Sequence, residues 1–258
     1  MPNIALITGA SSGLGAEFAR YHAEKGGDVI LVARRKPALD ALKKELESKH
    51  KIKATVIAMD LGSAEAAKKL HKAVKSKKLN VDILINNAGF GGHGNFIERD
   101  LDADLSMINL NVDALVTLSH LFGKDMVAQG SGKMLHVGST AGFMPGPKQA
   151  TYFATKAFVN SFSQALDQEF QGTGVTSSVL VPGYVETQFA QAASLEGTDL
   201  VSGGGKSASS CARIGYDGMM RGKLVIFNEL GLSIMLGWLL PFMPRRMALR
   251  MVEKMQTK

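Results

Sequence analysis

The stretch Thr8-Gly9-Ala10-Ser11-Ser12-Gly13-Leu14-Gly15 follows a short apolar run, Ile4 to Ile7, and leads into a segment with the apolar spacing of a helix. A glycine-rich loop between a strand and a helix leaves backbone N–H groups free at the positive end of the helix dipole, where they can receive a phosphate group. Glycine allows positive φ there and carries no Cβ that would hold the phosphate away from the main chain. The stretch therefore predicts a phosphate-binding turn, although its glycine spacing differs from the commoner G-x-G-x-x-G pattern.

The rest of the chain continues the alternation of strand-like and helix-like segments that this loop begins. Apolar runs predict seven strands, at residues 4–7, 29–32, 54–58, 83–85, 134–137, 177–181 and 224–227. Helical spacing predicts helices up to about residue 25, at 37–50, after 63, and at about 102–128, 152–170 and 207–220. Short apolar strands separated by helices are typical of a parallel sheet that helices cover on both faces. We therefore expect an α/β Rossmann fold with a doubly wound sheet, whose strand carboxyl ends form one ligand-binding edge.

The length of 258 residues fits one Rossmann-type domain, residues 1–258, and the sequence shows no repeat or linker that would divide it. Regularity weakens after Gly183, where a stretch rich in Gly, Ser, Ala and Gln begins. We expect a substrate loop or lid at about residues 187–220 and an apolar C-terminal segment at about 228–258.

Composition limits the setting in which the protein works. The single cysteine, Cys211, excludes an intramolecular disulfide, and the start of the chain lacks the basic segment of a signal peptide, so we expect a cytoplasmic protein. The net charge of +7 raises the question of nucleic acid, but the lysines from Lys68 to Lys78 follow one amphipathic helical pattern without interleaved aromatic residues. We therefore interpret them as a solvated face and expect neither a nucleic-acid partner nor a metal site.

The end of the second predicted strand carries Ala33-Arg34-Arg35. Proteins that bind NAD place an acidic residue at this point, on the ribose 2′-OH. A carboxylate would repel the 2′-phosphate of NADP, whereas a guanidinium can hold it with bidentate, charge-assisted hydrogen bonds. The sequence therefore favours NADP(H), with Arg34 as the first choice for the phosphate contact and Ser12 and Arg35 in support. The alternative is that both arginines are ordinary surface charges ahead of a helix.

Tyr152 and Lys156 stand four residues apart in a predicted helix, so their side chains share one face. A tyrosine has an ordinary pKa of about 10, too high for efficient proton exchange near neutral pH, and a nearby cation lowers that pKa by stabilising the phenolate. Ser139 follows the predicted strand 134–137, so the carboxyl edge of the sheet can bring its hydroxyl beside the phenol. The three residues together indicate acid–base chemistry on a substrate oxygen.

Taken in order, these motifs resemble the short-chain dehydrogenase/reductase family, in its compact, non-extended branch. The resemblance also rests on Asp60 after the third strand, Asn86-Asn87-Ala88-Gly89 after the fourth, Asn111 in the long helix, and Pro182-Gly183 after residues 177–181. These motifs occur in the family's order and at suitable separations, and the resemblance covers nearly the whole chain.

The resemblance implies a role for each motif. Tyr152 would be the general acid in reduction and the general base in oxidation, Lys156 would bind the nicotinamide ribose and lower the pKa of Tyr152, and Ser139 would stabilise the substrate oxygen. Asn111 would hold a water that links Lys156 to solvent, and Asp60 would meet the adenine. The predicted cofactor contacts are Gly9, Ser11, Ser12, Gly13, Leu14, Gly15, Arg34, Arg35, Asp60, Leu61, Asn87, Ala88, Gly89, Tyr152, Lys156, Pro182, Gly183, Val185 and Thr187.

These observations predict an NADPH-dependent oxidoreductase that reduces a ketone or aldehyde, or oxidises the matching alcohol, by hydride transfer. Two alternatives stay open: a catalytically silent NADP(H)-binding regulator, and a membrane-surface reductase of acyl-chain substrates. We expect a hydrophobic small-molecule substrate and a homodimer or homotetramer, with a membrane surface as the less favoured partner.

The apolar stretch from Leu230 to Met243 leaves three interpretations open. It can be a wall of a hydrophobic substrate pocket, a subunit contact, or an interfacial helix anchored by basic residues. The basic residues that follow it are Arg245, Arg246, Arg250 and Lys254.

Overall fold

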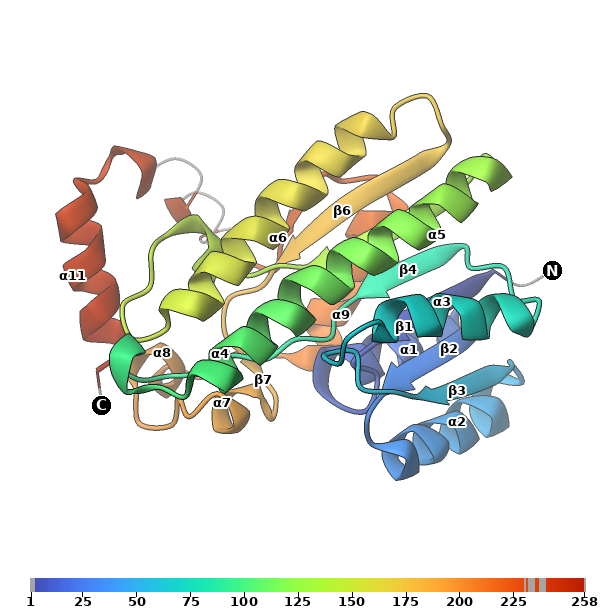
Figure 1. The fold of residues 1–258 in the computed structure, drawn as a ribbon, viewed down its shortest axis with the longest axis horizontal. Coiled ribbons are helices and arrows are strands. Elements are labelled where there is room, and N and C mark those ends of the chain that lie inside the picture. Colours follow the sequence, from blue (N-terminus) through green and yellow to red (C-terminus); the bar gives the residue numbers. More distant parts are fainter. Residues whose placement is uncertain (1–2, 230, 232–234, 237–239, 258) are drawn as a thin grey trace.

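The computed structural model describes residues 3–229, 231, 235–236 and 240–257. Among these residues the main sheet holds seven strands in the order β3-β2-β1-β4-β5-β6-β9, all parallel (Figure 1). The strands of this sheet are β1 (Ile4–Thr8), β2 (Asp28–Ala33), β3 (Ala54–Ala58), β4 (Ile83–Asn86), β5 (Gly132–Val137), β6 (Val175–Val181) and β9 (Val225–Phe227). The chain winds outward in both directions from the neighbours β1 and β4, which confirms the predicted doubly wound Rossmann fold.

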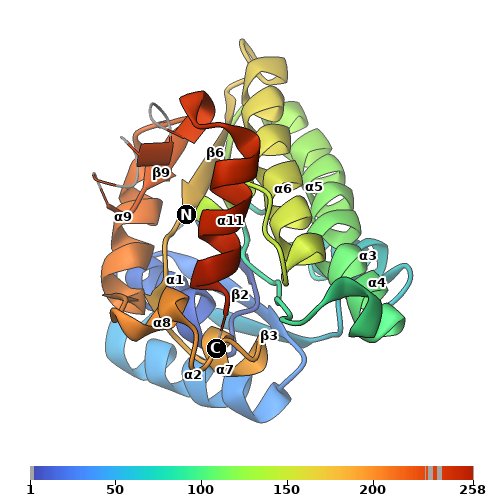
Figure 2. The same cartoon turned by 90° about the vertical axis from the view of Figure 1, so that its left-hand side faces the viewer.

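Helices cover both faces of this sheet, as Figures 1 and 2 show. The longer helices are α1 (Gly13–Glu24), α2 (Lys36–His50), α3 (Ala66–Ser76), α4 (Leu101–Ile108), α5 (Leu115–Gln129), α6 (Ala150–Glu169), α9 (Ala208–Met220) and α11 (Arg245–Met255). Strand β1 shows why the sheet needs both layers, since Ile7 packs in the core beneath α1, α2 and α9 while Leu6 packs beneath α3 and α5. A strand with apolar side chains on both faces is typical of a parallel sheet buried on both sides.

The long helix predicted at about residues 102–128 is interrupted. A π-helical segment, η2 (Asn109–Ala114), separates α4 from α5. A π-helical turn takes in an extra residue, so it changes which side chains face the sheet, and it often marks a functional position. Here it buries Asn111. Apolar spacing alone does not reveal this interruption, because the apolar residues on either side still recur at helical intervals.

The stretch Leu101–Gln129 is, within the described part of the chain, the one helical segment long and apolar enough to cross a membrane by length and composition. Its side chains Leu118, Phe122 and Met126 are buried against the sheet. Packing against the sheet accounts for part of its apolar composition, and Leu101, Leu105 and Ile108 are exposed.

The segment after β6, where we expected a substrate loop or lid, contains several short elements. These elements are β7 (Val185–Glu186), α7 (Phe189–Ala192), α8 (Asp199–Ser202) and β8 (Lys206–Ser207). Strands β7 and β8 pair with each other in a small parallel sheet that the sequence pattern does not indicate. This segment crosses the carboxyl edge of the main sheet and so lies next to the predicted site.

The C-terminal part ends in a helix that the sequence pattern did not predict. Half of the apolar stretch from Leu230 to Met243, namely residues 230, 232–234 and 237–239, lies outside the described residues. Beyond it, the short turn η5 (Leu240–Phe242) precedes α11, which stands at one end of the molecule (Figures 1 and 2). The end of α11 is tied to the body, because Gln149 Nε2 donates to Gln256 Oε1 at 2.6 Å and His93 Nε2 lies 2.7 Å from the Gln256 carbonyl oxygen.

Candidate active site

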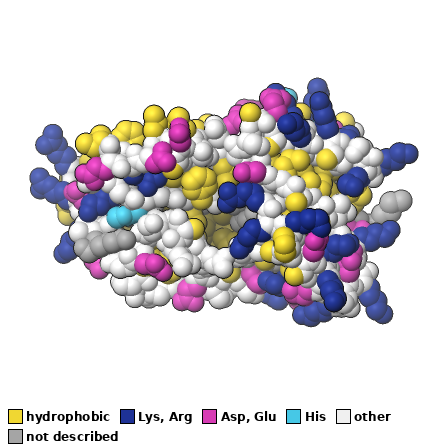
Figure 3. All heavy atoms as spheres, turned by 60° about the horizontal axis from the view of Figure 1, so that its bottom comes forward, with side chains coloured by type: hydrophobic (Ala, Val, Ile, Leu, Met, Phe, Trp, Pro, Cys, Tyr) yellow, Lys and Arg dark blue, Asp and Glu magenta, His cyan; other side chains and the backbone are white. Residues whose placement is uncertain are grey.

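A cavity of about 750 Å³ opens at the carboxyl edge of the main sheet. The loops that follow β1, β2, β4, β5 and β6 all line it, because the carboxyl ends of parallel strands meet at one edge. Figure 3 shows this hollow, with hydrophobic side chains inside and Lys and Arg side chains at its margin. Every predicted cofactor contact except Gly15 lines the cavity, and so do three of the four predicted catalytic residues, Ser139, Tyr152 and Lys156.

The glycine-rich turn after β1 is packed closely against the loop after β4. Gly9 has a φ of +68°, and a Cβ there would lie 2.7 Å from the side-chain nitrogen of Asn87. A Cβ on Gly15 would lie 2.3 Å from the Gly9 carbonyl oxygen, which explains why Gly15 supports the turn without lining the cavity. The Thr8 hydroxyl accepts hydrogen bonds from the backbone N–H groups of Asn87 and Ala88, both at 2.9 Å. The turn thus keeps the small, open shape that a pyrophosphate requires.

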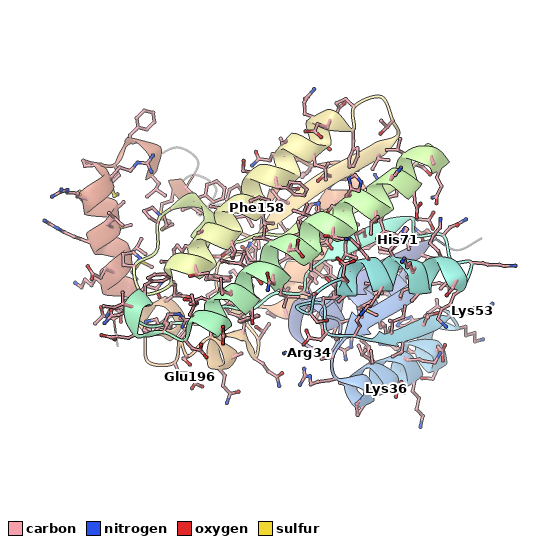
Figure 4. The ribbon with its side chains drawn as sticks, in the orientation of Figure 1. Arg34, Lys36, Lys53, His71, Phe158 and Glu196 are labelled. Carbon is pink, nitrogen blue, oxygen red and sulfur yellow. The ribbon has the colours of Figure 1, made fainter. Side chains whose placement is uncertain are left out.

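Both predicted arginines directly follow β2, and they are exposed and line the cavity (Figure 4 labels Arg34). The hydrogen bonds distinguish them, since Arg35 Nη2 donates to the hydroxyl of Ser12 at 2.9 Å and to that of Ser11 at 3.3 Å. Arg35 and Ser12 therefore already form a pair at the point where a 2′-phosphate would enter. Arg35, predicted as a supporting residue, is therefore as good a candidate for the phosphate contact as Arg34.

Tyr152 and Lys156 lie in the first turns of α6, and both side chains are buried. Burial raises the pKa of Tyr152 to about 12, and a hydrogen bond with Ser139 acts in the opposite direction. Burial also lowers the pKa of Lys156 to about 8. Lys156 Nζ donates to the Val137 carbonyl oxygen at 2.7 Å and lies 5.8 Å from the centre of the Tyr152 ring. In the ligand-free protein, burial rather than the ammonium therefore sets the pKa of the phenol.

Ser139 follows β5 and begins the short turn η3 (Thr140–Phe143). Its hydroxyl accepts a hydrogen bond from the Ala141 backbone N–H at 3.1 Å, which fixes the side chain and leaves the hydroxyl proton free to be donated. The motif order thus brings the hydroxyl, the phenol and the ammonium to one wall of the cavity.

Asn111 lies behind this wall rather than on it. Its side-chain oxygen accepts from the Phe90 backbone N–H at 3.1 Å, and its nitrogen donates to the Phe90 carbonyl at 3.0 Å and to the Thr155 hydroxyl at 3.1 Å. A Cβ on Gly89 would lie 2.8 Å from the Asn111 oxygen and 3.8 Å from Lys156 Nζ. Asn111 therefore fixes the loop that passes over Lys156, and its predicted water remains a prediction.

Sequence reasoning missed several residues at the substrate end of the cavity. Phe189 packs on Tyr152 with 5.4 Å between ring centres. Other residues come from the start of α6 and from the C-terminal part, and they are Gln149, Phe153, Met235, Leu236, Val252, Met255 and Gln256. The apolar C-terminal composition was the available signal. Met235 and Leu236 of that stretch line the cavity, as the pocket-wall interpretation expects, and the other two interpretations stay open.

A family model described as short chain dehydrogenase matches residues 3–197. The chain belongs to the short-chain dehydrogenase family. Proteins of this family are oxidoreductases with a nucleotide-binding Rossmann fold, and the family binds NAD or NADP.

Two similar solved structures cover most of the chain. The enzyme from Sphingobium yanoikuyae, in complex with NADPH, has a TM-score of 0.84 and 30% identity, covering 91% of this chain and 90% of that one. The bulky-bulky ketone specific alcohol dehydrogenase from Comamonas testosteroni has a TM-score of 0.78 and 28% identity, covering 89% and 87%.

A curated relative, the very-long-chain 3-oxoacyl-CoA reductase-B of Danio rerio, is 32% identical over 191 residues, or 72% of this chain. The matched region spans 61% of that relative's length.

Proposed function

We propose that this short-chain dehydrogenase is an NADP(H)-dependent reductase of hydrophobic ketones or aldehydes. The observation that carries the proposal is the meeting of Ser139, Tyr152 and Lys156 on one wall of a cavity whose other end is the glycine-rich turn. A regulator that only bound the dinucleotide would need the turn but not the buried phenol and ammonium. The intact acid–base group therefore favours an enzyme over the silent alternative.

The cavity residues suit each part of the reaction. The nicotinamide, when bound, supplies the hydride to the carbonyl carbon. Ser139 donates a hydrogen bond to the carbonyl oxygen and so stabilises the charge that develops on it. Tyr152 then gives its proton to that oxygen, and in the reverse direction takes the proton back. Lys156 would bind the nicotinamide ribose and stabilise the phenolate that remains.

The residues around Tyr152 support a hydrophobic substrate. The cavity wall there consists largely of apolar side chains, among them Met144, Phe153, Phe189, Leu195, Leu236 and Val252. Burial of apolar surface stabilises a bound substrate by about 0.8 kcal/mol per CH₂. The names of the relatives, a bulky-ketone dehydrogenase and a very-long-chain 3-oxoacyl-CoA reductase, are consistent with such a wall.

A series of 2-ketones from acetone to 2-decanone, followed by loss of NADPH absorbance, tests this proposal. We expect kcat/KM to rise about fourfold per added CH₂ until the apolar wall is filled. NADH in parallel should support slower turnover. Binding of NADPH without turnover of any ketone, aldehyde or alcohol would favour the silent regulator instead.

The choice of NADP over NAD rests on the guanidinium groups at the end of β2, where the described chain has no carboxylate. Replacing Arg34 or Arg35 with Asp should shift the preference from NADPH toward NADH by about tenfold or more, since each change removes a charge-assisted contact and adds repulsion. Lys44→Asp, on an exposed turn of α2 outside the cavity, makes the same change of charge and should leave the preference unaltered. A preference retained in both arginine variants would mean that other residues hold the phosphate.

Two further expectations remain proposals. A cytoplasmic location agrees with the single cysteine, which is buried and unpaired. A homodimer or homotetramer agrees with exposed apolar side chains on η1 (Phe96–Glu98) and α4, such as Ile97 and Leu101.

A further inference from the structure

Helix α11 presents three different stripes, each spaced by four residues. Ala248, Val252 and Gln256 form the buried stripe that packs onto the body. Residues four apart lie on one side of a helix. The residues one position before each member of the buried stripe therefore form a second stripe, and those two positions before form a third. The other two stripes, described below, consist of exposed residues.

The stripe next to the buried one is apolar and exposed. Met247, Met251 and Met255 are 61%, 37% and 39% exposed, and Phe242, in the turn just before the helix, is 84% exposed. Helices of soluble proteins usually turn such side chains inward. Figure 2 shows α11 at the surface of one end of the molecule, with its outer side uncovered by the described chain.

The third stripe is basic. Arg246, Arg250 and Lys254 are all exposed and make no ion pair within the described residues. Arg245 adds a fourth cation, and Glu253 is the one acidic residue of the helix. An amphipathic helix with basic residues beside an exposed apolar stripe is typical of helices that lie in the interface of an anionic membrane.

The apolar stripe is continuous with the rim of the cavity. Met255 is exposed and also lines the cavity, and so does Met235 from the preceding segment. Val252, which follows Met251 in the sequence, lines the cavity as well. A surface that covered the methionine stripe would therefore lie beside residues that line the cavity.

We propose that Phe242 and the methionine stripe of α11 insert into the interface of an anionic lipid bilayer, with Arg246, Arg250 and Lys254 bound to its headgroups. A second copy of the chain is the weaker candidate occupant, because two α11 helices would bring like charges together. An anionic membrane instead attracts each basic residue near its surface. Membrane binding does not depend on the proposed reaction, whereas entry of a lipophilic carbonyl from the bilayer rests on it.

Sedimentation with vesicles of phosphatidylcholine, alone or with added phosphatidylglycerol, tests the membrane contact without substrate or NADPH. We expect the protein to sediment with the anionic vesicles and to be released by high salt. The variant Arg246→Gln/Arg250→Gln/Lys254→Gln removes three charges and should bind the anionic vesicles about a hundredfold more weakly. A matched control, Lys69→Gln/Lys72→Gln/Lys77→Gln, removes the same charge from exposed positions on and beside α3 and should bind as the unchanged protein does.

A second variant separates insertion from charge. Phe242→Ser/Met247→Ser/Met251→Ser keeps all the cations and leaves Met255 at the cavity in place, and it too should lose vesicle binding. Unchanged thermal unfolding and unchanged reduction of a soluble ketone would show that the variants fold. Equal binding of the α11 variants and the α3 control, or no sedimentation of the unchanged protein, would overturn the proposal. A mass by light scattering that halves in the serine variant, without vesicle binding, would assign the stripe to a second copy instead.

Discussion

Replacing Tyr152 with Phe is expected to lower kcat for ketone reduction by about 10²- to 10⁴-fold, the usual contribution of general acid–base catalysis. Burial raises the pKa of Tyr152 to about 12, so the ligand-free protein holds at neutral pH the proton that reduction needs. Phe keeps the aromatic ring that packs against Phe153 and Phe189, with ring centres 6.2 and 5.4 Å away. The variant therefore loses a proton donor and little packing, and steady-state kinetics with NADPH measure the loss.

Two measurements make this result specific. Titration with NADPH should give nearly the same Kd, since the turn that would hold the pyrophosphate is unchanged. Tyr21→Phe removes a phenol that is hydrogen-bonded to Asp217 outside the cavity, at 3.0 Å, and should keep full activity. Turnover by Tyr152→Phe at the rate of the unchanged protein would refute the assigned mechanism.

Much of the fold could be predicted because its strands are buried on both faces. Runs such as Ile4 to Ile7 are apolar without alternation, and their spacing between helices fixes a parallel sheet. The π-helical segment at Asn111 could not be predicted in this way. Asn111 in this segment bonds to the backbone of Phe90, in the loop after β4. This is a tertiary contact, and the local spacing of apolar residues does not indicate it.

The site divides in a similar way. Ser139 and the glycine-rich turn were predictable because strand carboxyl ends meet at one edge, and Tyr152 with Lys156 because helix spacing places them together. Gln149 and Gln256 were missed, because their contact joins two segments that are 107 residues apart in the sequence. Side-chain direction was also beyond the sequence, as Arg35 rather than Arg34 bonds to Ser12.

Lys156→Met is expected to abolish most turnover and at the same time to stabilise the folded protein. The ammonium is buried, and burial lowers its pKa from 10.5 to about 8. That difference corresponds to about 3 kcal/mol of unfavourable free energy for the charged form in the folded state at neutral pH. Removing the buried charge should stabilise the folded protein by that amount, and loss of the hydrogen bond to the Val137 carbonyl lowers this stabilisation by about 1 kcal/mol. We therefore expect a net stabilisation of about 2 kcal/mol and a Tm higher by about 5 °C.

The pH dependence of unfolding distinguishes this cause from better packing. Because the folded pKa of Lys156 lies below the unfolded value of 10.5, the unfolded chain binds the proton more tightly between about pH 8 and 10.5. The unfavourable contribution is complete below pH 8 and disappears as the pH rises through that window. The difference in unfolding free energy between the Met variant and the unchanged protein should therefore shrink from pH 8 upward, while the shared titration of other groups cancels. A constant difference across the window would show that the charge is not the cause. A stabilised, inactive variant would mean that the buried ammonium lowers the stability of the folded protein. Such a loss of stability fits a residue kept for its contact with the cofactor and the phenol.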